Sequence, residues 1–267
     1  MIVMIRSLGL ALGVVALSSI GSFAQPASSL TLNDHTVGGP RSHKEGALWL
    51  PKGRAAPFAA VVVLSGCNGV KHTTRVWASR LASWGYAALI LDSFTPRGLK
   101  NVCHRGGELS GSERAKDALA GAAYLRTRPD IDPDRIAVLG YSHGGWTALE
   151  AATKSLVDQN GGRAFAAVVA YYPICLQEAP PLASDVQIFI GGADDWSSPK
   201  HCQAMAAGYA DTSAHRPLLK IFAAATHSFD VKREDRVYLG HRLSYDAAAA
   251  RASFAMARRF LHNHLRR

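Results

Sequence analysis

The sequence predicts a single α/β domain in which helices cover both faces of a mostly parallel sheet. Short apolar runs rich in β-branched residues alternate with longer helical stretches over most of the chain, as in strand-helix-strand units. The run at 58–64 (FAAVVVL) is apolar at every position, which is typical of a strand buried on both faces. No Gly- or Pro-rich linker of domain-splitting length follows residue 44, so the 267 residues are expected to hold one core.

The individual elements follow from periodicity and from capping residues. A helix is expected to begin at Ser110, where Glu113 completes a capping box, and to run to about Thr127 before Pro129 stops it. Further strands are predicted at 86–91, 135–140, 165–171, 186–190 and 218–223. Further helices are predicted at 73–84, about 143–157, about 199–209 and about 244–264.

The first 24 residues have the pattern of a signal peptide. One cation, Arg6, precedes an uncharged apolar run at 8–20, and small residues follow at 22–24. An uncleaved membrane anchor is the alternative, but this run is shorter than the roughly 20 residues that a bilayer span needs. We therefore expect export to the periplasm or the medium, without an integral membrane segment after cleavage. A flexible arm is expected at 25–43 and the α/β domain at 44–267.

The chain is strongly basic, with 30 Lys and Arg against 20 Asp and Glu, a formal net charge of +10. Loss of Arg6 with the signal peptide would leave 29 − 20 = +9, so the excess belongs to the mature domain. The cations are spread over several predicted elements without a helix-turn-helix or an aromatic-basic RNA motif, so nucleic acid is not an expected partner. A denser group near the C-terminus is interpreted as a solvated helix face; it comprises Arg258, Arg259, Arg266 and Arg267.

One motif points directly to chemistry. Residues 140–144 (GYSHG) spell G-x-S-x-G between a predicted strand and a predicted helix, which is the context of a nucleophile elbow. The glycines let strand and helix pack closely while the serine takes a strained backbone conformation. Ser142 is therefore the candidate nucleophile, with an ordinary Gly-rich turn as the alternative. Neither G-x-G-x-x-G nor a Walker A motif is present, so no nucleotide cofactor is expected.

A serine nucleophile needs a base and an orienting carboxylate, in the chain order Ser, Asp, His for this type of turn. Asp194 and Asp195 follow the next-to-last predicted strand, and His227 follows the last one. Because the carboxyl ends of parallel strands meet at one edge of a sheet, these side chains are expected near Ser142. We predict His227 as general base and then acid, and Asp194 as the orienting carboxylate. The residues themselves leave Asp195 open as the alternative.

An anionic tetrahedral intermediate also needs preorganised hydrogen-bond donors. The backbone N–H of His143, directly after the nucleophile, is one candidate. The backbone N–H of Cys67, in the loop at 65–69 (SGCNG), is the other. A plain turn whose glycines serve only geometry is the alternative for this loop.

Three further residues at strand ends are candidates for binding substrate. Arg97 is suited to a substrate carboxylate, because a guanidinium group binds such groups in a bidentate manner; a solvated arginine or an ion pair with Asp92 is the alternative. Tyr141 and Trp196 are candidates for lining an acyl pocket, although aromatic residues at strand ends also serve as core.

Five segments together resemble the dienelactone hydrolase family of α/β-hydrolases: VVVLSGCNG, LDSFTPRG, GYSHGG, GGADDW and THSFD. The resemblance spans about 44–265. It implies the α/β-hydrolase fold with an eight-stranded sheet, a catalytic triad of Ser142, Asp194 and His227, and hydrolysis of carboxylic esters or lactones without a cofactor. In the family pattern the acid is the first aspartate of the pair, which favours Asp194 over Asp195.

The chain departs from the family pattern in two places. Dienelactone hydrolase itself uses a cysteine nucleophile where this chain has Ser142, and Ser65 stands where a histidine often precedes the first glycine of the oxyanion loop. Hydrolases of this fold often carry a lid after the strand that ends at Tyr171. Here only the 14 residues at 172–185 separate that strand from the next, so the resemblance implies an open site without a large lid.

The four cysteines leave three disulfide pairings open on spacing alone. No two of them lie at a CxxC interval, which excludes a zinc ribbon, and no metal site is predicted. The strand order that the resemblance implies places Cys67 and Cys103 beyond one pair of neighbouring strand ends and Cys175 and Cys202 beyond another. It therefore implies the disulfides Cys67–Cys103 and Cys175–Cys202.

The sequence as a whole predicts an exported serine esterase that cleaves small-molecule esters or lactones through an acyl-enzyme intermediate. Two alternatives remain. G-x-S-x-G-G also resembles the catalytic domain of prolyl-oligopeptidase-like peptidases, and a hydrolase fold without catalysis could bind anionic polymers through its excess of cations.

Overall fold

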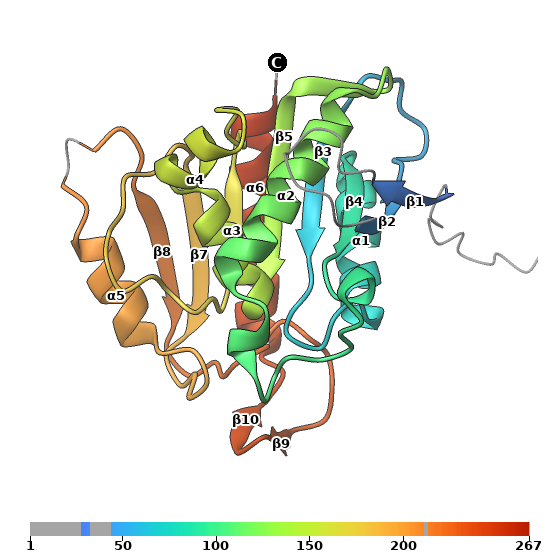
Figure 1. Ribbon diagram of the computed structural model, residues 1–267. Coiled ribbons are helices and arrows are strands. Elements are labelled where there is room, and N and C mark those ends of the chain that lie inside the picture. The colour runs from blue at the N-terminus through green and yellow to red at the C-terminus, as the bar shows by residue number, and fades with distance from the viewer. Residues whose placement is uncertain (1–27, 33–43, 211–212, 267) are drawn as a thin grey trace, which may run out of the picture.

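A mostly parallel sheet of eight strands runs through the centre of the protein (Figure 1). The structure is a computed structural model that describes residues 28–32, 44–210 and 213–266, and the predicted signal peptide lies outside these residues. The strands are β1 (Ser28–Leu32), β2 (Lys44–Trp49), β3 (Phe58–Leu64), β4 (Ala87–Asp92), β5 (Ile131–Tyr141), β6 (Val168–Tyr171), β7 (Val186–Gly191) and β8 (Pro217–Phe222). They lie in the order β1-β2-β4-β3-β5-β6-β7-β8. The pairs from β4 to β8 are parallel, whereas β2 is antiparallel to both of its neighbours.

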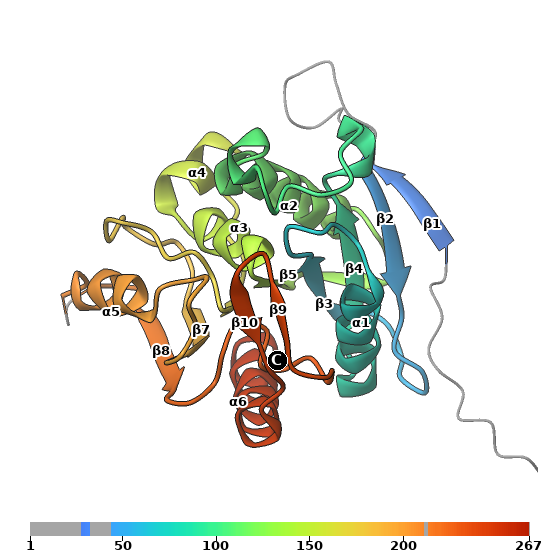
Figure 2. The same ribbon diagram turned by 90° about the horizontal axis from the view of Figure 1, so that it is seen from below.

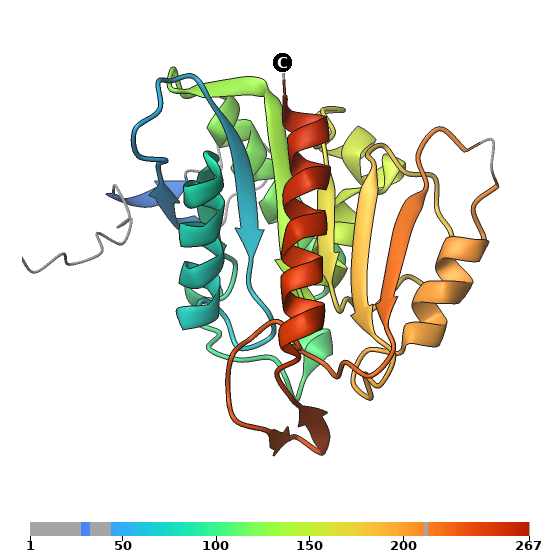
Figure 3. The same ribbon diagram turned by 180° about the vertical axis from the view of Figure 1, so that it is seen from behind.

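Helices cover both faces of this sheet, which confirms the predicted layer architecture. The helices are α1 (His72–Trp84), α2 (Gly111–Arg126), α3 (His143–Ala151), α4 (Lys154–Gln159), α5 (Pro199–Ala207) and α6 (Ala247–Leu265). Figure 1 shows α2 and α3 in front of the sheet, and Figure 3 shows α1 and α6 on the opposite face. The capping box at the start of α2 forms as predicted: the Ser110 hydroxyl accepts the Glu113 N–H at 3.1 Å, and the Glu113 carboxylate accepts the Ser110 N–H at 2.9 Å.

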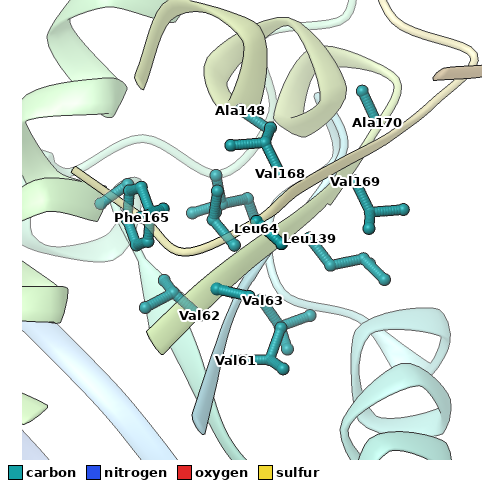
Figure 4. Packing of buried hydrophobic residues seen from close by; sticks show 14 of the residues in the cluster. Val61, Val62, Val63, Leu64, Leu139, Ala148, Phe165, Val168, Val169 and Ala170 are labelled. Atoms are coloured by element: carbon teal, nitrogen blue, oxygen red, sulfur yellow. The ribbon is translucent and has the colours of Figure 1, made fainter. Parts of the chain in front are cut away.

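The apolar strands form the core between the two helix layers. Residues 59–64 of β3 are all buried, as are all six residues of β7, because helices cover each strand on both sides. Figure 4 shows part of this core, to which β3, β5 and β6 contribute. Leu64 pairs with Gly140, and Tyr141 pairs with Tyr171. The carboxyl ends of β3, β5 and β6 therefore lie at one edge of the sheet, where their loops meet.

Three parts of the fold differ from the sequence predictions. Within the predicted arm, β1 pairs with β2 at the edge of the sheet, and neither strand was predicted. The helix predicted at 143–157 is broken, because Thr153 forms a β-bridge with Leu182 and the chain starts a new helix there. After β8 the chain forms an unpredicted two-stranded hairpin, β9 (Arg236–Tyr238) and β10 (His241–Leu243).

Both predicted disulfides are confirmed, with S–S distances of 2.03 Å for Cys67–Cys103 and 2.07 Å for Cys175–Cys202. The first joins the loop after β3 to the loop after β4, and the second joins the loop after β6 to α5. Each bridge therefore ties loops together at the carboxyl edge of the sheet. No helix in the described part of the chain has the length and apolarity that a membrane span requires.

Candidate active site

Ser142 lies in a sharp turn between β5 and α3. Its backbone has φ 56° and ψ −123°, a conformation that is rare for residues other than glycine and typical of a strained functional position. A Cβ atom at Gly140 would lie 1.9 Å from the Gly144 carbonyl oxygen, and one at Gly144 would lie 2.3 Å from the Leu64 carbonyl oxygen. Both flanking glycines are therefore required by space, because the turn packs backbone against backbone.

His227 and Asp194 complete a hydrogen-bonded chain with this serine. The Ser142 hydroxyl lies 3.0 Å from His227 Nε2, and His227 Nδ1 lies 2.9 Å from Asp194 Oδ2. Asp194 Oδ1 accepts the backbone N–H groups of Trp196 at 3.0 Å and Ser197 at 2.8 Å. Both His227 and Asp194 are buried. The structure thus brings together the three residues predicted to form the triad, and the carboxylate is fixed on both of its oxygens.

Asp195 points elsewhere, although it is the next residue in the chain. Its carboxylate is half-exposed and lies 3.4 Å from His241 Nδ1. It also accepts the backbone N–H of Arg242 at 3.3 Å. Since His241 and Arg242 belong to the hairpin, Asp195 attaches the hairpin to the loop after β7, while Asp194 faces His227.

A fully buried arginine on α2 connects the two loops that carry the predicted oxyanion donors. Arg114 Nη2 donates to the Ser65 carbonyl at 2.9 Å, and its Nη1 lies 2.9 Å from Nδ1 of His143. Its guanidinium carbon lies 4.7 Å from the centre of the Phe94 ring. Ser65 begins the loop that holds Cys67, and His143 directly follows Ser142. Arg114 therefore holds in place the segments whose backbone N–H groups were predicted to bind the oxyanion.

The contact with Arg114 also determines the tautomer of His143. Because a guanidinium group can only donate, His143 Nδ1 is the acceptor and the ring hydrogen lies on Nε2. Burial, followed by the positive charge of Arg114, lowers the pKa of His143 from 6.5 to about 4. Burial also lowers the pKa of Arg114 to about 10. At neutral pH the pair is therefore a neutral imidazole beside a charged guanidinium group.

This geometry agrees with the result of a family comparison. A model of the dienelactone hydrolase family matches residues 45–265, which is most of the chain. The chain belongs to the dienelactone hydrolase family. The match covers all three residues of the hydrogen-bonded chain and both loops that Arg114 connects.

Individual relatives of this family member are more distant. Bis(hydroxyethyl) terephthalate hydrolase of Streptomyces coelicolor is 36% identical over 95 residues, which cover 36% of this chain and 28% of that protein. Dipeptidyl peptidase 8 of Homo sapiens is 35% identical over 92 residues, 32% of this chain and 9% of that protein. The chain spans less than half the length of the curated relatives it matches.

Solved structures show the same fold over almost the full length. A dienelactone hydrolase-like promiscuous phosphotriesterase from metagenomic libraries matches with a TM-score of 0.67 at 22% sequence identity. The match covers 89% of this chain and 97% of that one. At this level of identity the likeness establishes the α/β-hydrolase fold.

An open cleft of about 230 Å³ lies above Ser142 and His227. Tyr141 and Trp196 both line it, as predicted, and Trp196 packs against the His227 ring at a centroid distance of 5.1 Å. Figure 2 shows the β9–β10 hairpin in front of this edge of the sheet. Its Tyr238 packs against Trp196 at 5.8 Å. The described segment at 172–185, after β6, holds no large lid. The cleft is lined by the loop after β3, the loops after β7 and β8, and the hairpin.

The prediction that Arg97 lies in the site is wrong. Its guanidinium group forms a two-pronged ion pair with Asp117 of α2, at 2.7 and 3.1 Å, and also donates to the Ser93 carbonyl. Neither Arg97 nor the Asp92 considered as its partner lines the cleft. The arginine is used instead to join the loop after β4 to α2. The cleft has other cations, which the sequence did not single out: Lys71, Arg233 and Arg236.

The hairpin that supplies Arg236 and Tyr238 was missed because its turn carries a weak sequence signal. Leu239 and Gly240 both have positive φ, 54° and 85°, as a two-residue hairpin turn requires. Asn-Gly or Asp-Gly is the usual indication of such a turn, and leucine at the first position conceals it. Within the described residues, no three His, Cys, Asp or Glu side chains lie close enough to hold a metal ion.

Proposed function

We propose that this chain is a serine hydrolase that cleaves carboxylic esters or lactones through an acyl-enzyme on Ser142. The observation that carries the proposal is the unbroken chain from the Ser142 hydroxyl through both nitrogens of His227 to Asp194. A serine hydroxyl is a weak nucleophile unless an adjacent base accepts its proton. His227 is positioned to do so, and Asp194 holds the ring with its hydrogen on Nδ1.

The first half of the reaction follows from this arrangement. The Ser142 oxygen attacks the substrate carbonyl carbon while His227 Nε2 takes the hydroxyl proton. The carbonyl oxygen becomes an oxyanion, which accepts hydrogen bonds from the backbone N–H groups of Cys67 and His143. When the tetrahedral intermediate collapses, the bond to the alcohol oxygen breaks. His227 gives its proton to that alcohol, and the acyl group remains on Ser142.

The second half repeats these steps with water. The cleft is open to solvent, so a water molecule can replace the departed alcohol. His227 removes a proton from the water as it attacks the acyl carbon, and the same two N–H groups stabilise the second oxyanion. Collapse breaks the bond to Ser142, His227 returns the proton to the serine oxygen, and the carboxylic acid leaves.

The walls of the cleft favour compact substrates that are neutral or negatively charged. A volume of about 230 Å³ between Tyr141, Trp196 and Tyr238 fits a short acyl chain or a single ring. The described residues that line the cleft include the cations Lys71 and Arg233 but no carboxylate. An ester that bears a carboxylate is therefore expected to be a better substrate than its cationic counterpart.

A fluorophosphonate probe and p-nitrophenyl esters test the proposal. We expect the wild-type protein to be labelled and to hydrolyse p-nitrophenyl butyrate. Ser142→Ala should abolish the label and lower kcat by at least about 10⁴-fold. Ser228→Ala is the control, because Ser228 is another residue with a hydroxyl group that lines the same cleft.

A wild-type protein that is folded but neither labelled nor active would exclude the proposed function. Cleavage of a dipeptide p-nitroanilide in preference to every ester would establish the peptidase alternative.

We also propose that the protein acts outside the cytoplasm. The signal-like pattern of the first 24 residues and the presence of two disulfides support export, because disulfides persist in oxidising compartments. Fractionation of cells that express the full chain, followed by mass spectrometry of the mature N-terminus, tests this. A cytoplasmic protein that still begins at Met1 would contradict it.

A further inference from the structure

A second, larger hollow lies at the opposite edge of the sheet from Ser142. It has a volume of about 880 Å³ and lies between the segment before β3, the end of α1 and the last turns of α6. Figure 3 shows this end of α6 at the top and the β9–β10 hairpin at the bottom. We call the hollow the arginine groove, after the five arginines that line it together with His262: Arg54, Arg135, Arg258, Arg259 and Arg266.

Three of these arginines act on one buried side chain of the groove. Tyr86 is among the residues that line it. Burial raises its pKa, while the charges of Arg258, Arg54 and Arg135 oppose the rise, so three elements direct positive charge at one phenol. The Arg54 side chain packs over Gly85, the residue that caps the end of α1, since a Cβ at Gly85 would lie 2.6 Å from the Arg54 guanidinium carbon. Arg54 therefore belongs to the wall of the groove despite its exposed position.

The positive charge of the groove is largely uncompensated. None of the described residues that line it carries a carboxylate side chain. Arg135 forms an ion pair with Asp132 at 2.8 Å and donates to the Leu265 carbonyl, so it serves the fold. For Arg54, Arg258, Arg259 and Arg266 the structure shows no ion pair with any described carboxylate. Four guanidinium groups thus line one hollow without an ion pair to any carboxylate in the described part of the chain.

The dipole of α6 does not account for this cluster. Cations at the last turn of a helix are stabilised by its negative end, and the effect is confined to that turn. It applies to His262 and Arg266. Arg258 lies further back along α6, and Arg54 lies on a different segment. Mutual repulsion among these arginines costs free energy, which a bound anion would offset.

We propose that the arginine groove binds a ligand that carries several phosphate groups. A planar guanidinium fork matches the oxygens of phosphate in a bidentate manner. Four such forks around one hollow suit an anion with several adjacent charges better than a single carboxylate. The site is separate from the Ser142 cleft, so it adds a binding function to the hydrolase. Such phosphates can be presented by a free compound or by the surface of an anionic membrane.

Calorimetric titration with tripolyphosphate tests the proposal on the purified chain. We expect binding in about 50 mM salt that weakens strongly in about 200 mM salt, because phosphate contacts release counterions. The double variant Arg54→Gln/Arg258→Gln should lose at least about tenfold in affinity, since each lost hydrogen bond to a charged group weakens binding severalfold. Fluorophosphonate labelling at Ser142 and the melting temperature verify that this variant is folded.

A matched variant separates a site from general attraction by net charge. Arg75→Gln/Arg251→Gln removes the same two charges from exposed positions outside the groove and should keep its affinity within about twofold. Equal loss in both variants, or no binding of tripolyphosphate and of phosphatidylglycerol vesicles by the wild type, would overturn the proposal. Groove-dependent binding to vesicles alone would assign the phosphates to a membrane surface, and binding to tripolyphosphate alone to a free ligand.

Discussion

Arginines at the two edges of the central sheet lie in opposite environments. At the carboxyl edge Arg114 is fully buried, and its guanidinium group is held by the Ser65 carbonyl, His143 and the Phe94 ring. At the amino edge Arg258 is exposed and lines a hollow whose described lining residues include no carboxylate. Burial requires that a polar group be satisfied within the protein, so Arg114 organises the site from inside. The exposed guanidinium groups of the arginine groove, in contrast, remain available to bind a ligand from solution.

The carboxyl edge repeats this contrast between neighbouring residues. Asp194 is buried and bonded on both oxygens, while Asp195 is half-exposed and contacts the hairpin. In both comparisons, Arg114 with Arg258 and Asp194 with Asp195, the residue whose polar atoms are bonded within the protein is the one that belongs to the candidate site. Substitutions that keep shape but remove charge or bonding can test whether this distinction holds.

The largest effect is expected for Asp194→Asn. An amide at this position favours the wrong tautomer of His227, and kcat should fall by about 10⁴-fold. Asp195→Asn is the matched control and should change kcat by less than about threefold, as exposed substitutions usually do. Steady-state hydrolysis of p-nitrophenyl butyrate by both variants measures the difference. Similar losses of kcat in the two variants would contradict the assignment of Asp194, rather than Asp195, as the carboxylate that orients His227.

The next effect concerns the pH dependence of stability through His143. Its pKa is about 4 in the folded protein and 6.5 when exposed, so between these values the unfolded chain binds more protons. The contribution of His143 to the free energy of unfolding is therefore fully present above pH 6.5 and is lost as the pH falls toward 4. The loss from this group amounts to about 3 kcal/mol, at about 1.4 kcal/mol per pKa unit. His143→Gln removes the titration while keeping an acceptor for Arg114.

Urea unfolding at neutral pH and near pH 4.5 measures this difference. Wild type should lose more stability over the interval than His143→Gln. The raised pKa of buried Asp230 acts in the opposite direction, because it favours proton binding by the folded state, but it is common to both proteins and cancels in the comparison. Parallel curves for the two proteins would mean that His143 takes up its proton without unfolding.

How much of this edge the sequence could predict depends on the range of the interactions. Ser142, His227 and the two aspartates were found because parallel strand ends must converge, whatever the details of the loops. The disulfide pairs followed from the strand order that the family resemblance implied. Arg97 was misplaced because its partner, Asp117, lies on a helix, and only the packing of that helix brings the two together.

Other features depended on contacts that no local pattern records. Arg114 looks like any other helix cation in the sequence, and its burial appears only when α2 packs against the loops after β3 and β5. The group near the C-terminus was interpreted as a solvated face. That interpretation holds for the exposure of Arg258, but it missed Arg54, which reaches the same hollow from a distant part of the chain. The edge strands β1 and β2 were missed because their short segments carry no long apolar run.

A smaller effect is expected for Arg114→Met, which keeps the side-chain stem and removes the guanidinium group. The Ser65 carbonyl and His143 Nδ1 would lose their donor, at a cost of about 2 kcal/mol of stability. Loosening of the two donor loops should lower kcat by about tenfold or more with little change in KM, because misplacement affects the oxyanion more than substrate binding. A change in KM alone would contradict this role. Arg114→Lys, which restores charge but not the fork, should recover stability better than kcat.

The same substitution at the amino edge should have the smallest effect. Arg258→Met removes an exposed guanidinium group that has no carboxylate partner, and the retained stem can still cover the groove floor. The free energy of unfolding should change by less than about 0.5 kcal/mol. Any gain should appear at low salt and vanish at high salt, because it comes from relief of repulsion with Arg54 and Arg135. Urea unfolding of Arg258→Met and Arg114→Met at both salt concentrations compares the edges directly. A loss as large as that of Arg114→Met would mean that Arg258 is already satisfied within the fold, and the groove would then have one cation fewer to offer a ligand.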